Sequence, residues 1–357
     1  LLAVALAAFT MFSCSNEEIA DLGSNAPGEK ATLTIKVEGE GNNVAQSRAI
    51  GTTTTDVTIN NYIVFLFREG GALDCPPFYS SSNGAATITN GSTAAKTAYV
   101  VANVGTLANS PFANVTTEAE LKAVAGDLMA SNNTASQTRT NLWMSGTSNV
   151  TFNGTSGTVT VPLSFVAAKI ELIVKDNRTN LTGGTIEITD ENVVLLYAGK
   201  SGKFFGTTAD KAAQTAFYSG DISYPDFQTG VATESAVLKD AVGAAFTANA
   251  NGDVFNHFYT FGNDGTSKPT ILAIQSKRTV GGADETIYYP IQFTVADAGN
   301  TIEPGNAYTV TLTLNGDVSA GGGGGTTNPE QPLVKSQITV TVTAATWLAK
   351  TVSKDFN

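Results

Sequence analysis

The sequence contains very little histidine and cysteine. One histidine and two cysteines occur among its 357 residues. A structural zinc ion takes about four Cys or His ligands and a haem takes at least one axial ligand, so His257, Cys14 and Cys75 cannot supply the common sites. A framework of disulfides is excluded as well, which leaves Cys75 as an unpaired and inert thiol. We expect neither a metal ion nor a cofactor.

Positive charge is also scarce. The chain has 20 Lys and Arg residues against 31 Asp and Glu residues, a net charge of −11, so it repels phosphate backbones and we expect no nucleic-acid partner. Charged residues make up only 14%, whereas glycine reaches 35 residues, a balance typical of many short strands joined by small-residue turns. The composition favours an all-β fold, and the length suits two domains of about 150 to 200 residues.

The N-terminus has the pattern of an export signal. Residues 1–12 form an apolar run that is shorter than the ~20 residues of a membrane-spanning helix but suits a signal peptide, although the basic n-region is missing. Cys14 follows directly within FSCSN, as at the cleavage site of bacterial lipoproteins, so we expect it to be acylated, with residues 15–30 as a tether. A buried cysteine at the end of a core segment is the alternative.

The rest of the chain repeats with period two. In residues 32–38, Leu33, Ile35 and Val37 alternate with polar residues, the pattern of a half-buried strand. Continuous apolar runs at 62–67 and 97–104 predict central strands. Two groups of about seven strands lie on either side of residue ~166, which favours two seven-stranded β-sandwiches in tandem. Helical spacing predicts few and short helices, over 118–130 and 234–247.

The two ends of the chain share one pattern. Ile338, Val340 and Val342 repeat the alternation of the N-terminal strand, and they follow a glycine-rich linker. Arg48 lies in a polar loop where a trypsin-like, Arg-specific protease would cut before Ala49 and detach residues 14–48.

Burial explains why such a cut would matter. Seating a strand of this kind contributes on the order of 5 to 10 kcal/mol gross. A strand from another molecule gains as much but must displace the resident strand and lose its translational freedom. We therefore expect an uncut monomer with its first strand docked and residues 335–357 loose, and after the cut a filament built by head-to-tail strand addition. Alternatively, both strands pack within their own domains and Arg48 is an ordinary loop arginine.

Several segments in order resemble the Bacteroidales-type fimbrillins, subunits of protease-assembled pili. They are FSCSN at 12–16, NYIVFLF at 61–67, AYVVANVG at 98–105, NLWMSG at 141–146, VAAKIEL at 166–172, FYTFGN at 258–263 and PGNAYTVTLTLNG at 304–316. The resemblance implies transthyretin-like sandwiches, lipidation at Cys14, processing between Arg48 and Ala49, and a donor strand within 335–357. By position, the donor residues are Ile338, Val340, Val342, Trp347, Leu348, Val352 and Phe356. Trp347 has the opposite parity to the first three, so the donor register stays open.

The resulting domain plan has six parts. They are a signal peptide at 1–13, a lipidated tether and removable strand at 14–48, sandwiches at 49–166 and 167–320, a Gly-rich linker at 321–334 and the donor region at 335–357. The plan describes a structural subunit rather than an enzyme. We expect this subunit to pass through the inner membrane, to be held at the outer membrane by its lipid, and then to join other copies and minor fimbrial subunits in an adhesive surface fimbria.

Competing sites have weaker patterns. A surface-anchored glycan-binding lipoprotein is the alternative function, with Trp143, Met144 and Tyr288–Tyr289 as a sugar platform, although buried aromatics explain these residues more simply. His257 stands between aromatic residues without a nucleophile motif and indicates a core or edge histidine. The adjoining carboxylates of Asp190 and Glu191 indicate a solvated turn rather than a calcium site. The segment Gly199–Ser201 indicates a turn rather than a phosphate-binding loop.

Overall fold

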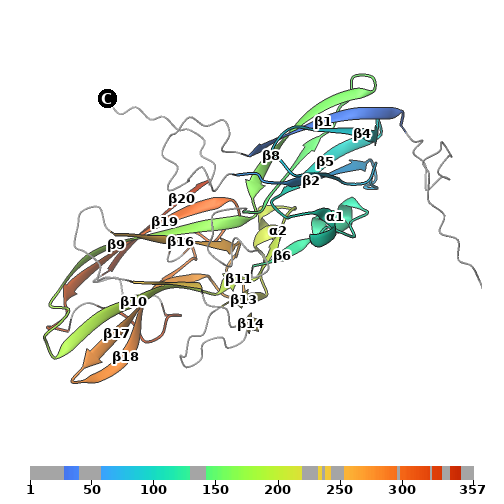
Figure 1. Ribbon diagram of the computed structural model, residues 1–357. Helices are drawn as coiled ribbons and strands as arrows, with labels where there is room; N and C mark the ends of the chain where they lie inside the picture. Colours follow the sequence, from blue (N-terminus) through green and yellow to red (C-terminus); the bar gives the residue numbers. More distant parts are fainter. Residues whose placement is uncertain are drawn as a thin grey trace, which may run out of the picture.

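The chain is a two-part all-β protein, as its composition predicts. The computed structural model describes residues 28–39, 58–128, 142–218, 232–234, 238–242, 253–295, 298–321, 324–331 and 338–346. Within these ranges the helices are short: α1 (Glu118–Ala123), α2 (Thr208–Ala212) and a 3-10 turn at Leu107–Asn109. No helix in these ranges is long and apolar enough to cross a membrane. Figure 1 shows the two groups of strands, which meet end to end in an elongated molecule.

The first group is the N-terminal sandwich, a seven-stranded sheet in the order β3-β2-β5-β7-β8-β1-β4. Its two ends face one another, because Leu33 and Val161 from one end pack in the same buried cluster as Val64 and Val100 from the other. The strands are β1 (Lys30–Gly39), β2 (Tyr62–Arg68), β3 (Phe78–Ser80), β4 (Ala86–Ser92), β5 (Ala95–Ala102), β7 (Met144–Asn149) and β8 (Ser156–Phe165).

Strand β2 is apolar from Tyr62 to Phe67 because both of its faces are covered there. Val64 and Leu66 point into the N-terminal sandwich. Phe65 and Phe67 belong to a different buried cluster, which continues into the second group of strands. In it the centroid of the Phe65 ring lies 5.9 Å from that of the Phe112 ring. The continuous run at 62–67 therefore predicts this central strand correctly.

The second group is the C-terminal sandwich, a four-stranded sheet (β15-β10-β17-β18) facing a seven-stranded sheet (β14-β13-β11-β16-β9-β19-β20). Leu172 of β9 and Leu312 of β19 share a buried core with Leu195 of β10 and Ile274 of β17. The strands are β9 (Ala167–Thr179), β10 (Ile186–Leu196), β11 (Ala198–Gly199), β13 (Ala216–Tyr218), β14 (Ala232–Glu234), β15 (Leu238–Ala241), β16 (Asp253–Phe261), β17 (Ile271–Val280), β18 (Ala283–Gln292), β19 (Asn306–Asp317) and β20 (Ile338–Thr346).

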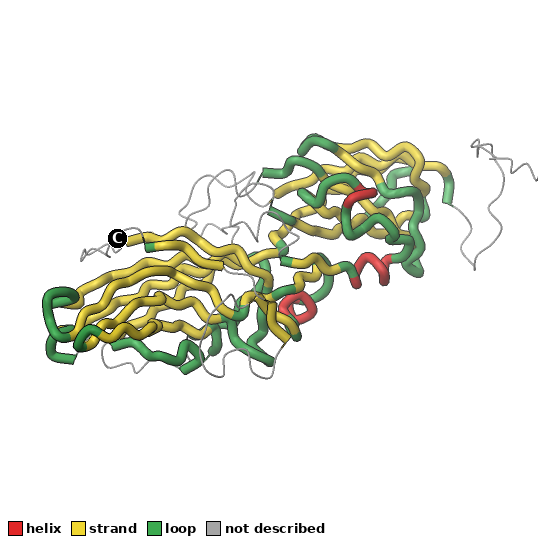
Figure 2. Tube along the Cα trace, turned by 60° about the horizontal axis from the view of Figure 1, so that its bottom comes forward, coloured by secondary structure: helices red, strands yellow, loops and turns green. Residues whose placement is uncertain are grey.

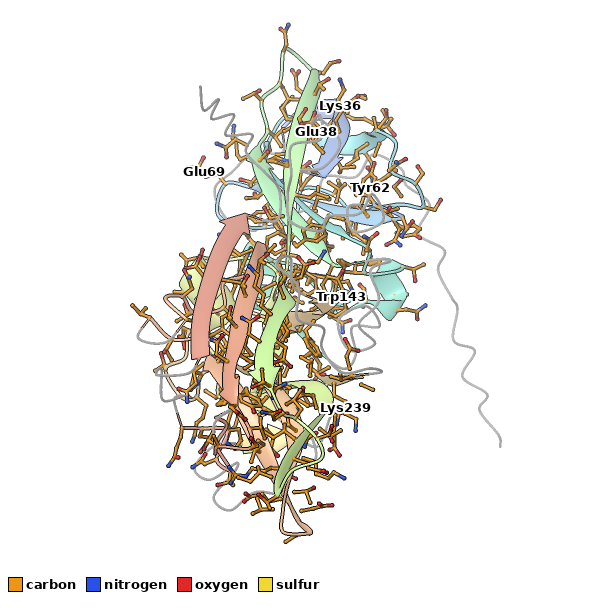
Figure 3. All side chains as sticks on the ribbon, turned by 90° about the vertical axis from the view of Figure 1, so that its left-hand side faces the viewer. Lys36, Glu38, Tyr62, Glu69, Trp143 and Lys239 are labelled. Carbon is orange, nitrogen blue, oxygen red and sulfur yellow. The ribbon has the colours of Figure 1, made fainter. Side chains whose placement is uncertain are left out.

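A small two-stranded sheet joins the two sandwiches. It pairs β6 (Ala125–Asp127) with β12 (Ser201–Lys203), and Gly126 lies opposite Gly202. A Cβ on Gly126 would lie 2.1 Å from the ring of Trp143, so only glycine fits there. The Trp143 ring stacks on Phe261 with 6.0 Å between ring centroids, and Figure 3 shows Trp143 where the two sandwiches meet.

Both helix predictions need correction. The capping box of Thr117 and Glu120 is present, but α1 ends at Ala123 because residues 125–127 pair with β12 instead of continuing the helix. The predicted helix over 234–247 is wrong in its described part, where β15 pairs with β10. Tertiary strand pairing overrides helical spacing in both places, and Figure 2 shows how little helix the molecule carries.

A charge cluster lies inside the C-terminal sandwich. The Arg178 guanidinium donates at 2.7 Å to Asp176 Oδ2 and at 2.6 Å to Asp190 Oδ2, and its side chain is fully buried. Burial alone would lower the pKa of Arg178, but the hydrogen bond to Asp176 and the charge of Asp190 hold it above its ordinary value. The predicted solvated turn at Asp190 is therefore wrong, because this carboxylate is a buried ion-pair partner in β10.

Candidate functional site

The N-terminal strand β1 is an interior strand. It runs parallel to β8, with Leu33 opposite Gly157 and Val37 opposite Val161. On its other side it runs antiparallel to β4, with Ile35 opposite Ala86. We call the position between β8 and β4 the β1 slot. The strand predicted over 32–38 is thus present, docked and bonded along both edges.

The side chains of β1 alternate as the sequence predicts. Leu33, Ile35 and Val37 are buried in the core of the N-terminal sandwich, with exposed fractions of 1%, 0% and 8%. Lys36 and Glu38 are exposed on the outer side (Figure 3). Burying three branched side chains contributes about 5 to 9 kcal/mol gross, so the slot holds β1 firmly while the strand belongs to the chain.

The C-terminal strand β20 lies at the edge of the C-terminal sandwich. It pairs antiparallel with β19, and Ile338, Val340 and Val342 stand opposite Leu314, Leu312 and Val310. The expectation of a loose tail is therefore wrong for the backbone of Ile338–Thr346, which is docked on its own chain. This pairing satisfies the backbone hydrogen-bonding groups on the side of β20 that faces β19.

The segment before β20 is also held. The Thr326 and Tyr288 backbones exchange hydrogen bonds of 2.7 and 2.9 Å. The Glu330 carboxylate accepts from the Tyr197 hydroxyl at 2.6 Å and from Lys268 Nζ at 2.8 Å. We call these contacts the Glu330 clasp. The segment predicted as a linker over 321–334 is thus attached to the sheet at residues 326–330.

Several predicted site residues lie outside the described residues: Cys14, Arg48, Ala49, Trp347, Leu348, Val352 and Phe356. The structure therefore describes β1 and the backbone of β20, but not the residues at which lipidation and processing are predicted. It also adds residues that the sequence did not single out. Glu330 stands in a polar, proline-containing segment that resembles a linker, and no local pattern predicts its partners.

The described residues do not assemble the competing sugar or metal sites. Met144, Tyr288 and Tyr289 are buried, with exposed fractions of 2% or less, so they form no sugar platform. Within the described ranges no group of three His, Cys, Asp or Glu residues could hold a metal ion. Burial raises the pKa of the Cys75 thiol to about 11, which keeps it protonated and unreactive.

Two family models match the chain. The C-terminal domain of FimA-like major fimbrial subunit protein matches residues 167–347, more than half of the sequence. The major fimbrial subunit protein (FimA) matches residues 31–196, which include all of the N-terminal sandwich except Lys30, the first residue of β1.

Solved structures agree with these matches. A candidate cell adhesion protein from Bacteroides eggerthii DSM 20697 is 63% identical, with 91% of this chain and 98% of that chain covered and a TM-score of 0.82. A candidate cell adhesion protein from Parabacteroides distasonis ATCC 8503 shares the fold at 18% identity, with 89% and 97% covered and a TM-score of 0.58. No curated protein matches the chain. The chain belongs to the FimA-like major fimbrial subunit family and is a Bacteroidales fimbrillin.

Proposed function

We propose that this fimbrillin polymerises by exchanging strands between copies after proteolysis at Arg48. The observation that carries the proposal is the place of β1: it is bonded on both edges in the interior of a sheet, yet it precedes Arg48 near the N-terminal end of the sequence. A single cut after Arg48 would leave β1 held by non-covalent contacts only. Its departure would expose the apolar floor of the β1 slot to a strand from another copy.

The edge position of β20 makes it easier to release than the interior strand β1, and this suits it to be the donor. Releasing β20 breaks its one described ladder, with β19, whereas releasing β1 breaks two. The donor region, residues 335–357, would leave its own subunit, where β20 is an edge strand, and enter the β1 slot of the next subunit. The contact joins two different surfaces, so it does not close on itself and generates a filament.

The maturation steps complete the proposal. Acylation at Cys14 holds the precursor at the outer membrane, and the cut between Arg48 and Ala49 removes lipid, tether and β1 together. The mature subunit then joins other copies and minor fimbrial subunits in a surface fimbria that supports adhesion. Its role is structural rather than catalytic, in agreement with its family.

Polymerisation of purified protein tests the proposal. Full-length chain treated with an Arg-specific protease should give a ladder of multimers on non-denaturing gels and in size-exclusion chromatography. Arg48→Gln should block both the cut and the ladder, and a chain lacking residues 335–357 should be cut but stay monomeric. Clean cleavage at Arg48 followed by persistent monomer would contradict strand exchange.

Acylation needs its own measurement. Cells fed a labelled fatty acid should incorporate the label into the wild-type precursor but not into Cys14→Ser. Equal labelling of the two precursors would place the lipid elsewhere.

A further inference from the structure

Strand β4 has an unusual place in the N-terminal sandwich, because it ends the sheet order next to β1. Among the described strands, β1 is the only one that pairs with β4. Their ladder runs from Lys30 opposite Ser92 to Ile35 opposite Ala86. If β1 leaves, β4 therefore loses its strand ladder, while β8 keeps its pairing with β7. The strands β4 and β8 are the two walls of the β1 slot, so one of these walls depends for its strand pairing on the strand that fills the slot.

Two side chains from the opposite part of the sandwich hold the ends of β4. Two residues before its start, the Gly84 carbonyl accepts at 2.6 Å from the hydroxyl of the fully buried Tyr62 in β2. At its end, the buried Asp74 carboxylate accepts from the Ser92 backbone N–H at 2.6 Å and from the Ser92 hydroxyl at 2.5 Å. None of these hydrogen bonds involves β1.

Asp74 is itself fixed to β2. Its backbone N–H donates to the Leu66 carbonyl at 2.8 Å, and its carboxylate accepts from Arg68 Nε at 2.8 Å. Leu66 and Arg68 both belong to β2. Through Tyr62 and Asp74, β2 on the far side of the core is thus hydrogen-bonded to the residues at the two ends of the β4 segment, Gly84 and Ser92.

We propose that Tyr62 and Asp74 are positioning residues that keep β4 in place when the β1 slot is empty, so that a strand of a second copy finds both walls formed. The inference rests on the proposed strand exchange. A wall that stays ordered does not have to be ordered again when the incoming strand binds, and such pre-organisation strengthens binding. Without these hydrogen bonds and without β1, β4 would depend on the packing of Ala86 and Ile88 and on its chain connections.

The chain's own thiols allow a direct test. Cys14 lies in the fragment that the cut releases, whereas Cys75 is buried and burial raises its pKa to about 11, so a dye at neutral pH selects Cys14. The labelled, non-acylated full-length chain is cut after Arg48 and diluted. Fluorescence anisotropy then reports the dissociation constant of the fragment that carries β1, in mild urea where binding is too tight for dilution alone.

The informative variant is Tyr62→Phe combined with Ser92→Ala, which removes one hydroxyl at each end of β4 and keeps the apolar packing. We expect the fragment's dissociation constant to rise about 5- to 100-fold, the usual combined net effect of two buried hydrogen bonds. Hydrogen exchange of the backbone amides of Ala86–Ser92 should accelerate in the emptied variant. Tyr79→Phe is the matched control, because it removes a phenol hydroxyl from an exposed tyrosine in the neighbouring β3 and should leave both measurements unchanged.

The outcomes separate this inference from the proposed function. If the double variant keeps the wild-type dissociation constant and the same exchange in β4, the two residues serve only general stability and the inference is overturned. If the wild-type fragment leaves and the double variant shows the expected loss but no polymer forms, strand exchange between copies fails and the role of the two residues stands. A wild-type fragment that never leaves overturns both.

Discussion

Replacing Ile35 by alanine tests how much of the N-terminal sandwich depends on β1. Ile35 is fully buried and lies between Val159 of β8 and Ala86 of β4. Deleting an isoleucine side chain at such a position costs about 2 to 5 kcal/mol of unfolding free energy, because the surrounding strands collapse only partly into the space. Lys36 is the next residue and is exposed, so Lys36→Ala should change the unfolding free energy by less than about 0.5 kcal/mol. Urea denaturation followed by tryptophan fluorescence and far-UV circular dichroism measures both.

The same substitution should weaken the hold of the slot on the cut fragment. A loss of about 2 to 5 kcal/mol corresponds to a dissociation constant raised roughly 30- to 5,000-fold. The dye at Cys14 reports this value as described above. Equal behaviour of Ile35→Ala and Lys36→Ala, in unfolding and in fragment release, would refute the reasoning that burial of the alternating residues holds β1.

Three further predictions concern other parts of the chain. Arg178→Met leaves two buried carboxylates without their cation and should cost about 3 to 5 kcal/mol in urea denaturation, whereas Arg278→Met, in a partly exposed ion pair, should cost under about 1 kcal/mol. Gly126→Ala forces the Trp143 ring away and should cost about 1 to 3 kcal/mol with a shifted tryptophan emission; an unchanged spectrum would contradict the contact. The pKa of the Cys75 thiol rises from 9.0 to about 11 on folding, so its contribution to stability should be complete below pH 9 and disappear as the pH rises to about 11, and a Cys75→Ala chain should lack this part of the pH dependence.

The strands of the candidate site were predictable because their patterns are local. Alternation in residues 32–38 reports one buried and one exposed face, and that is how β1 lies. The bonding partners of β1 were not predictable, because β8 is more than a hundred residues away in sequence and a parallel ladder leaves no local mark. The small sheet of β6 and β12 escaped for a similar reason: Ala-Gly-Asp and Ser-Gly-Lys have no apolar period.

The residues that hold loops and edges were missed for a different reason. Glu330 and Asp74 are carboxylates in polar or turn-like segments, where sequence reasoning expects contact with water. Both are instead bound by other side chains of the fold, Glu330 by Lys268 and Tyr197 and Asp74 by Arg68 and Ser92. A polar residue in a loop carries no signal of a distant partner, so only the fold reveals these contacts.

The joint between the two sandwiches has a mechanical consequence. The β6–β12 pairing, the facing glycines and the Trp143–Phe261 stack tie the sandwiches together through backbone and close ring contacts. Bending at this joint would have to break strand pairing and open a packed aromatic contact at the same moment. Any fibre built from this subunit would therefore bend between subunits rather than within one. Its stiffness would depend on how well each inserted strand fits its slot.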